Sequence, residues 1–241
     1  MTNVDIIKKL KKSTFTDEDG EKYKLGFELA LTDDEILHLS KRFPSGKIAV
    51  ELEEILKETK GWSGYGLETA YFDSIDEFGF TELIPHSVTL GHDGFGNYWV
   101  LEVKDDGDLG SIYFACHDPA VLVLYCKTLN EYFESLVEFF ESPDHNYLNE
   151  VHEKVVMDIW KTTPNTDEIA DFRKKNSDLS SFLAEFTDDD WVVADLRRAK
   201  KADGFAWGKF GPSQFTKKHP TESVWVIRKK KKGFLSKLFG R

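Results

Sequence analysis

One short apolar strand does most to constrain how this chain can fold. Val121 to Tyr125 carries apolar side chains on both faces, a pattern typical of a central strand that is covered on both sides. Thr128-Leu129-Asn130-Glu131 follows as a capping box, which predicts that a helix begins there and ends before Pro143. The apolar residues of that helix recur at helical spacing: Leu129, Phe133, Leu136, Val137 and Phe140. The sequence therefore predicts a sheet that packs against a helix.

Further strands and helices are expected ahead of this unit. Residues that tolerate positive φ form two turns, Asp93–Asn97 and Asp105–Gly107. The four expected strands are Ser87–Leu90, Asn97–Val103, Ser111–Cys116 and Val121–Cys126. Upstream, a second capping box at Thr32–Glu35 begins one helix, and Gly61 ends the next. This order of helices, strands and helix predicts an α+β fold, with an antiparallel or mixed sheet flanked by helices.

The C-terminal third predicts a small α+β subdomain of its own. A helix ends near Trp160, residues 162–166 resemble a linker, and one or two short helices follow. Three aromatic strands are expected at Trp191–Leu196, Phe205–Phe210 and Val224–Arg228. We therefore expect four parts: an N-terminal helix and lead-in at 1–29, a main domain at 30–143, an α+β extension at 144–228, and a basic amphipathic tail at 229–241.

The charge of the chain is unevenly distributed. Its formal net charge is −11, which argues against a general nucleic-acid binder, because such a protein needs a basic face. The last 14 residues contain seven cations and no acid, so the rest of the chain holds 25 cations against 43 acids, a charge of −18. An acidic body attracts basic partners, whereas a basic tail attracts anionic surfaces.

Several features favour a cytoplasmic protein. Cys116 and Cys126 fall in expected strands, where small apolar residues are usually buried, and this usage is typical of a reducing compartment. No stretch reaches the roughly 18 uncharged apolar residues of a membrane helix. The first residues lack the apolar run and cleavage site of a signal peptide.

Two segments of the expected meander resemble the Smi1/Knr4 family, also called the SUKH superfamily. They are PHSVTLGHDGFGNYWVL at 85–101 and IYFACHDP at 112–119. The helix that begins at Leu31–Ile36, the Gly61-Trp62 pair and the helix from Thr128 occur in the same order as in that family. The resemblance covers roughly residues 30–142. Many members carry an Asn-Gly-Gly-like turn after the second helix, where this chain has Lys60-Gly61-Trp62.

The resemblance implies a SUKH-like fold that binds protein, without a cofactor or catalytic residues. Bacterial members of this family are immunity proteins that neutralise toxins, many of them nucleases. Fungal members regulate cell-wall synthesis through several partners. An immunity protein for a basic toxin is therefore the first expectation, and a regulatory or scaffold protein of envelope synthesis is the second.

Three patterns that suggest small ligands have simpler explanations. Gly91–Gly96 is rich in glycine like a phosphate loop, but a strand follows it where a phosphate loop needs a helix. Asp105–Gly110 starts like a calcium loop, but its twelfth position is Cys116 where a glutamate is required. Three histidines of the meander could contribute to a metal site with Asp118: His86, His92 and His117. None of them are spaced as in a helical metal motif. We therefore expect no metal, no cofactor and no enzyme activity.

The expected partner site combines acids with aromatic side chains near glycines. Its candidate residues are Trp62, Tyr65, Asp73, Asp76, Glu77, Asp93 and Asp118. Core packing is the alternative for Trp62, and an ordinary solvated surface is the alternative for each group of acids.

The tail is a separate candidate, for binding an anionic membrane surface at the inner face of the membrane. Its candidate residues are Lys229, Lys230, Lys231, Lys232, Phe234, Leu238 and Phe239. Two alternatives remain for it: that it folds back on the acidic body, or that it is a mobile solubilising segment.

Overall fold

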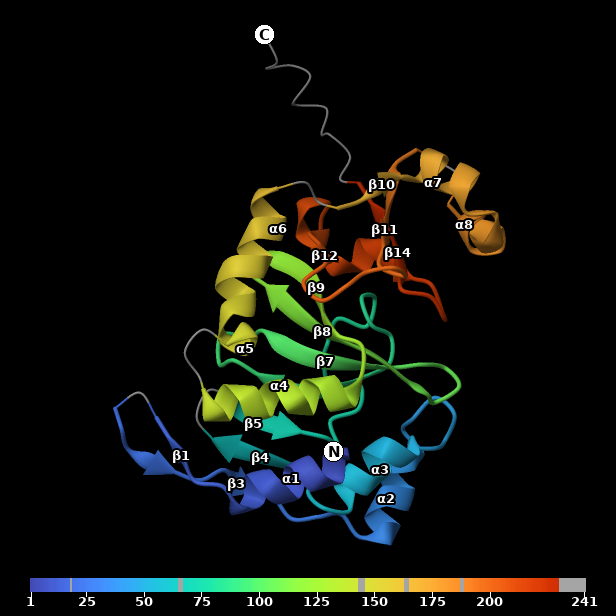
Figure 1. The fold of residues 1–241 in the computed structure, drawn as a ribbon. Helices are drawn as coiled ribbons and strands as arrows, with labels where there is room; N and C mark the ends of the chain where they lie inside the picture. Colours follow the sequence, from blue (N-terminus) through green and yellow to red (C-terminus); the bar gives the residue numbers. More distant parts are fainter. Residues whose placement is uncertain (18, 65–66, 143–145, 163–164, 187–188, 230–241) are drawn as a thin grey trace.

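The computed structural model describes the chain except for residues 18, 65–66, 143–145, 163–164, 187–188 and 230–241. It confirms an α+β fold, in which a large antiparallel sheet stacks against a smaller one (Figure 1). The large sheet has the strand order β12-β9-β8-β7-β6-β5-β4-β3. Its strands are β3 (Gly26–Phe27), β4 (Gly61–Gly64), β5 (Leu67–Tyr71), β6 (Ser87–His92), β7 (Tyr98–Val103), β8 (Leu109–His117), β9 (Ala120–Cys126) and β12 (Gly204–Phe205).

The central strands are buried on both faces, as the run at Val121–Tyr125 predicts. On β9, Val121, Val123 and Tyr125 pack in the cluster that includes the helices. The alternate residues Leu122 and Leu124 pack in a second cluster, with side chains of the smaller sheet. The period of two along each strand therefore divides one apolar run between two cores.

Helices cover the first face of the large sheet. The longest is α4 (Leu129–Glu141), which begins where Glu131 donates its backbone N–H to the Thr128 hydroxyl at 3.2 Å. It buries Phe133, Leu136 and Phe140 against the sheet. The other helical segments of the N-terminal part and this layer are α1 (Asn3–Lys12), α2 (Asp33–Ser40), α3 (Val50–Leu56), α5 (Tyr147–Glu150), a π-helical segment (Val151–Val156) and α6 (Met157–Lys161). A two-residue ribbon, β1 (Phe15–Thr16) and β2 (Lys22–Tyr23), extends from the N-terminal part.

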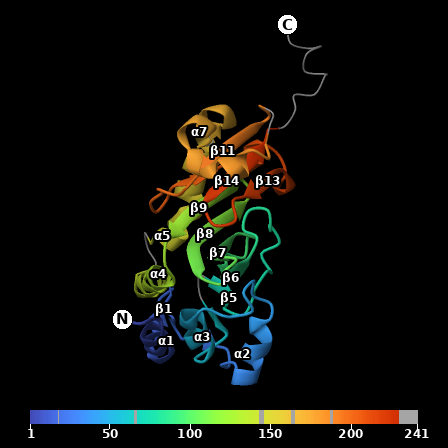
Figure 2. The same ribbon diagram turned by 90° about the vertical axis from the view of Figure 1, so that its right-hand side faces the viewer.

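The smaller sheet packs on the second face of the large one and has its own helical cover. Its order is β10-β11-β14-β13, with β10 (Asp167–Glu168), β11 (Trp191–Asp195), β13 (Thr216–Lys218) and β14 (Val224–Arg228). Phe172 on α7 (Ile169–Lys175) and Leu183 on α8 (Ser180–Leu183) pack against Val193 and Val226 on its outer side. The layers are therefore helix, sheet, sheet and helix; Figure 2 shows α4 and α5 beside the large sheet and α7 beside β11 of the smaller sheet.

The expected strand Phe205–Phe210 is wrong. Only Gly204–Phe205 is a strand, and it joins β9 of the large sheet, while Trp207–Lys209 forms a 3₁₀ turn. Gly204 lies so close to β9 that a Cβ there would come within 2.3 Å of the Leu122 carbonyl oxygen. The C-terminal extension thus contributes a strand to the large sheet and shares a buried cluster with it.

A buried ion pair connects the two sheets. Lys218 of β13 places its Nζ atom 2.5 Å from Oε1 of Glu102 on β7, and both side chains are less than a tenth exposed. Trp225 of β14 donates its indole N–H to the Leu83 carbonyl at 2.6 Å. Across the described ranges, no helix is long and apolar enough to pass through a bilayer.

Candidate functional site

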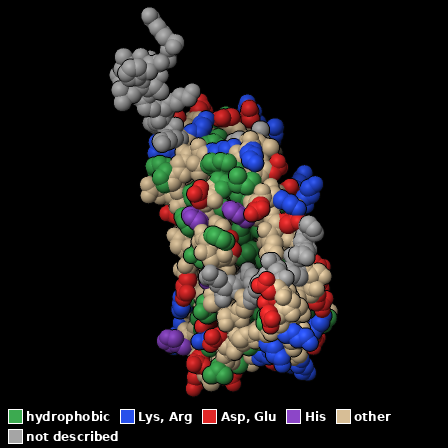
Figure 3. Space-filling model, turned by 90° about the vertical axis from the view of Figure 1, so that its left-hand side faces the viewer, with side chains coloured by type: hydrophobic (Ala, Val, Ile, Leu, Met, Phe, Trp, Pro, Cys, Tyr) green, Lys and Arg blue, Asp and Glu red, His purple; other side chains and the backbone are tan. Residues whose placement is uncertain are grey.

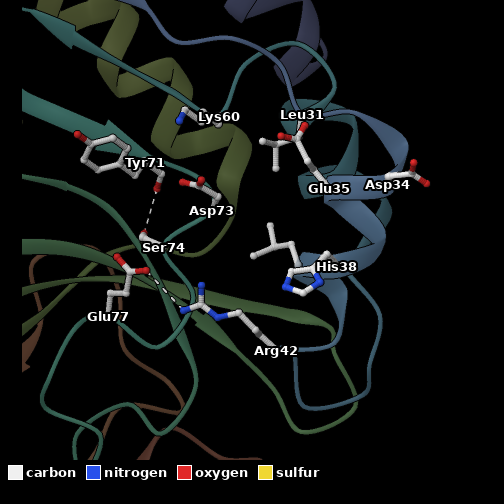
Figure 4. A pocket seen from close by; sticks show the side chains of 11 residues that line it. Leu31, Asp34, Glu35, His38, Arg42, Lys60, Tyr71, Asp73, Ser74 and Glu77 are labelled. Carbon is white, nitrogen blue, oxygen red and sulfur yellow. Dashed lines mark hydrogen bonds and ion pairs between the residues drawn. The ribbon is translucent and has the colours of Figure 1, made fainter.

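The N-terminal half of the large sheet leaves room for a pocket on its second face. In the described part of the chain, the cluster that joins the two sheets contains no residue of β4, β5 or β6. A pocket of about 630 Å³ lies there, between α2 and the connection from β5 to β6 (Figure 4). Its lining residues are Leu31, Asp34, Glu35, His38, Leu39, Arg42, Lys60, Tyr71, Asp73, Ser74 and Glu77.

Helix α2 forms one wall of the pocket. Its capping box is present as predicted: the Glu35 carboxylate accepts hydrogen bonds from the backbone N–H and hydroxyl of Thr32, both at 2.8 Å. These bonds stabilise the charged carboxylate and lower the pKa of Glu35. Asp34 and His38 of α2 and Arg42 in the turn after it also line the pocket.

The end of β5 forms the opposite wall. Phe72 is buried in the core, whereas its neighbours Tyr71 and Asp73 line the pocket. Tyr71 is 41% exposed. Asp73 is half-buried, and its carboxylate accepts no hydrogen bond from any other described residue. Burial raises the pKa of Asp73, because a partly desolvated carboxylate is less stable in its charged form.

Arg42 is held at the edge of the pocket. Its Nη2 atom donates to the Ile75 carbonyl at 2.5 Å and lies 3.5 Å from Oε1 of Glu77, as Figure 4 shows for the Glu77 contact. Ser74 is also occupied, because its hydroxyl donates to the Thr89 carbonyl at 2.8 Å and lies 3.3 Å from the Tyr71 carbonyl. Among the acids around the pocket, Asp73 therefore has neither a capping role nor an ion pair with a described residue.

Only part of the expected partner site gathers here. Asp73 and Glu77 line the pocket. Asp76 turns away with φ of +60°, accepts the Ser87 N–H at 3.3 Å, and lies 3.6 Å from Nδ1 of His86. It therefore shapes the connection to β6. Tyr65 lies outside the described residues.

The role expected for Trp62 as a partner anchor is corrected. Its side chain is 1% exposed, and its ring lies 5.3 Å from each of the rings of Phe27 and Phe72. Trp62 is therefore a core residue, which is the alternative that the sequence left open for it. Tyr71 is the aromatic residue that the sequence reasoning missed. The alternation from Thr69 to Phe72 could have revealed it, since Ala70 and Phe72 are the apolar members of that strand.

Asp93 and Asp118 lie in turns at the other ends of strands, outside this pocket. The Asp93 carboxylate accepts the backbone N–H groups of Phe95 (2.9 Å) and Asn97 (3.1 Å) and the Asn97 side-chain amide (2.7 Å). Asp93 therefore holds the turn between β6 and β7, which is an antiparallel hairpin as expected. Phe95 at its tip is 79% exposed. Asp118 is exposed in the turn between β8 and β9.

Two of the three histidines of the meander have side-chain hydrogen-bond partners on neighbouring strands or turns. His92 Nε2 lies 2.6 Å from the Thr69 hydroxyl, and His117 Nδ1 lies 3.3 Å from Oδ1 of Asn97. Within the ranges that the structure describes, no three His, Cys, Asp or Glu side chains are grouped as a metal site requires. Burial raises the pKa of Cys116 to about 11, so its thiol is a poor nucleophile.

The first cation of the tail contacts the body. Lys229 Nζ lies 2.7 Å from Oε2 of Glu168, and the Lys229 backbone N–H donates to the Asp190 carbonyl at 2.6 Å. The other tail candidates lie outside the described residues: Lys230, Lys231, Lys232, Phe234, Leu238 and Phe239.

Acids elsewhere on the body are often paired. Glu53 on α3 lies 2.7 Å from Lys57, and Glu58 after this helix lies 3.1 Å from Lys8. On the side away from α2, acids and cations are interspersed, and hydrophobic side chains gather at mid-height (Figure 3). The pocket differs from these surfaces because it combines a hollow, an unpaired carboxylate and an exposed aromatic ring.

The comparisons with known proteins leave the family open. A scan against protein-family models, a search of the curated proteins and a search of the solved structures each gave no match. The resemblance of residues 30–142 to the Smi1/Knr4 family therefore stays a prediction from the sequence.

Proposed function

We propose that this protein is a binding module that forms a one-to-one complex with a basic protein, and that it neutralises a toxin in this way. The observation that carries the proposal is the pocket between α2 and the end of β5. Four acids line it, Asp34, Glu35, Asp73 and Glu77, against the two cations Arg42 and Lys60. An acidic hollow on a body of charge −18 attracts cationic surfaces and accelerates their association.

Binding accounts for the pocket better than catalysis does. General acid–base catalysis needs a proton donor or acceptor within hydrogen-bond reach of a second reacting group. Among the described residues, the Asp73 carboxylate forms no hydrogen bond with His38, Tyr71 or Ser74, and the Ser74 hydroxyl is occupied by backbone carbonyls. Exposed tyrosine is, in contrast, enriched at protein interfaces.

The resemblance of residues 30–142 to the Smi1/Knr4 family supports the same function, because immunity proteins neutralise toxins by stoichiometric binding. We place the complex in the cytoplasm, where both cysteines stay reduced. The complex needs no cofactor and no nucleic acid.

Growth rescue tests the function. The chain is expressed in cells together with each member of a panel of basic nuclease toxins, and rescued pairs are purified as complexes. We expect rescue from at least one toxin and a one-to-one complex on a sizing column. The double variant D73N/E77Q should lose rescue, whereas E134Q/E138Q should keep it, because it removes the same charge from the exposed face of α4. The proposal would be contradicted if neither the natural chain nor the control variant rescued growth from any toxin of the panel.

A second function rests on the tail, which combines consecutive cations with apolar residues. We propose as the alternative a regulatory or scaffold protein of envelope synthesis that docks on the inner membrane face. Each cation near an anionic leaflet contributes about 1 kcal/mol to binding. Liposome co-sedimentation of the full chain and of a chain that ends at Lys229 tests it. Equal sedimentation of the two chains on anionic vesicles would contradict it.

A further inference from the structure

Among the described residues, three of the acids that line the pocket form no ion pair, and Asp73 is the one of these three that is half-buried. Arg42 is tied to the Ile75 carbonyl and Glu77, so its guanidinium is held at the edge. Lys60 lies beyond ion-pair distance of every described acid, although its charge acts on both Asp73 and Glu35. Asp73 is thus half-buried without direct neutralisation, an arrangement that is unfavourable in the free protein.

An aromatic ring lies on the same wall. Tyr71 and Asp73 are two residues apart and both line the pocket, on the wall opposite α2 (Figure 4). Tyr71 is 41% exposed, so part of its side chain is accessible to a partner. A ring face and a carboxylate side by side attract a planar cation, which stacks on the ring and binds the carboxylate through its edge.

We propose that this pocket receives an arginine side chain of the basic partner, with its guanidinium bound to Asp73 and packed on Tyr71. This inference rests on the proposed function, because it names the group by which the partner enters the same pocket. Arginine fits better than lysine for three reasons: its guanidinium is planar, it presents donors in a fork that matches a carboxylate, and it is more weakly hydrated. A pocket of about 630 Å³ admits such a side chain together with neighbouring parts of the partner.

Arg42 and Lys60, the two cations that line the pocket, limit its affinity for a cationic side chain. Arg42 is paired with Glu77, the Glu35 carboxylate is bound by Thr32, and Asp34 is exposed, which leaves Asp73 as the half-buried acceptor for an incoming guanidinium. Lys60 opposes any second cation near Asp73, because like charges at close range repel. Removal of the Lys60 charge should therefore strengthen binding, whereas removal of the Asp73 charge should weaken it.

The test uses the full chain labelled with ¹⁵N and the capped peptides Ac-Gly-Arg-Gly-NH₂, Ac-Gly-Lys-Gly-NH₂ and Ac-Gly-citrulline-Gly-NH₂. Chemical-shift titration gives the affinity of each peptide at constant ionic strength. We expect the arginine peptide to bind most tightly, the lysine peptide several-fold more weakly, and the neutral citrulline peptide without saturation. D73N should lower the affinity for the arginine peptide about 10-fold or more, Y71L about 3-fold, and K60Q should raise it about 2-fold, while E134Q should leave it unchanged.

Two results would overturn the inference: equal binding of the arginine and citrulline peptides, or an unchanged arginine affinity in D73N. Thermal unfolding of each variant shows that it is folded, so a loss of binding is not a loss of structure.

The failure of the proposed function can be distinguished from the failure of the arginine assignment. If a toxin binds and D73N/E77Q abolishes binding while the arginine peptide does not bind, only the arginine assignment is wrong. If the arginine peptide binds as expected but no toxin is neutralised, the assignment stands and the toxin function is wrong.

Discussion

Asp73 couples the site to the stability of the protein. Burial raises its pKa, although Lys60 and Arg42 lower it and Glu77 adds to the rise, so the folded state holds the Asp73 proton more tightly than the unfolded state does. Above the folded pKa, the charged carboxylate therefore opposes folding, and this cost disappears as the pH falls below the unfolded pKa near 3.9.

D73N should accordingly stabilise the protein slightly at neutral pH. Because the side chain is half exposed and solvent screens it, we expect well under 1 kcal/mol, or about 1–2 °C in Tm at pH 7, with no gain near pH 3.5. Thermal unfolding of the natural chain and D73N at both pH values measures this difference. A clear fall in Tm at pH 7 would show that Asp73 is a structural residue and not a site residue.

Trp62 and Tyr71 show how far the sequence alone could assign the aromatic residues. The alternation from Thr69 to Phe72 marks Tyr71 as facing away from the core, but whether Trp62 shares the core face depends on the register of β4 and β5. That register places Trp62 in the core and Tyr71 at the pocket.

W62A should destabilise the protein by about 3–5 kcal/mol, because it removes a large buried ring and leaves a cavity. Y71A should cost less than about 1 kcal/mol, because much of its ring is exposed. Urea unfolding measures both changes. Similar losses in the two variants would contradict the assignment of these residues to core and pocket.

Among the elements, those with local signals were predictable. The helices α2 and α4 begin at the predicted threonine caps, and the four strands expected between 87 and 126 are present. The strand expected at Phe205–Phe210 was wrong because its pairing is non-local: only Gly204 and Phe205 reach Val123 and Leu122, and the chain then turns. The uncovered part of the large sheet was likewise invisible in the sequence, because it depends on where the smaller sheet packs.

The pair Lys218–Glu102 should connect the two sheets energetically. K218M leaves the Glu102 charge buried without a partner, so we expect a loss of about 3–5 kcal/mol in the free energy of unfolding. The adjacent exposed pair Lys217–Glu185 is the matched control, and K217M should cost less than about 1 kcal/mol. Chemical denaturation measures both variants. Equal effects would mean that the buried pair contributes no more than a surface pair.

At the scale of the whole molecule, the net charge of −11 averages an acidic body and a basic tail. The structure shows that many of the body's acids pair within the fold, while Asp73 does not. Of the residues predicted for the partner site, Asp73 and Glu77 lie in the pocket, whereas Asp76 and Asp93 hold turns. The sequence indicates where acids are abundant, but only the packing shows which of them remain available to a partner.

The central claim is that the pocket, and not the total negative charge, binds the basic partner. The dissociation constant of the purified complex tests it most directly, measured for the natural chain, for D73N/E77Q and for E134Q/E138Q at one ionic strength. Both variants lose two negative charges, so long-range attraction falls equally. We predict that D73N/E77Q weakens binding at least about 10-fold, whereas E134Q/E138Q changes it less than about 2-fold. Equal weakening by the two variants would contradict the claim and assign the attraction to overall charge alone.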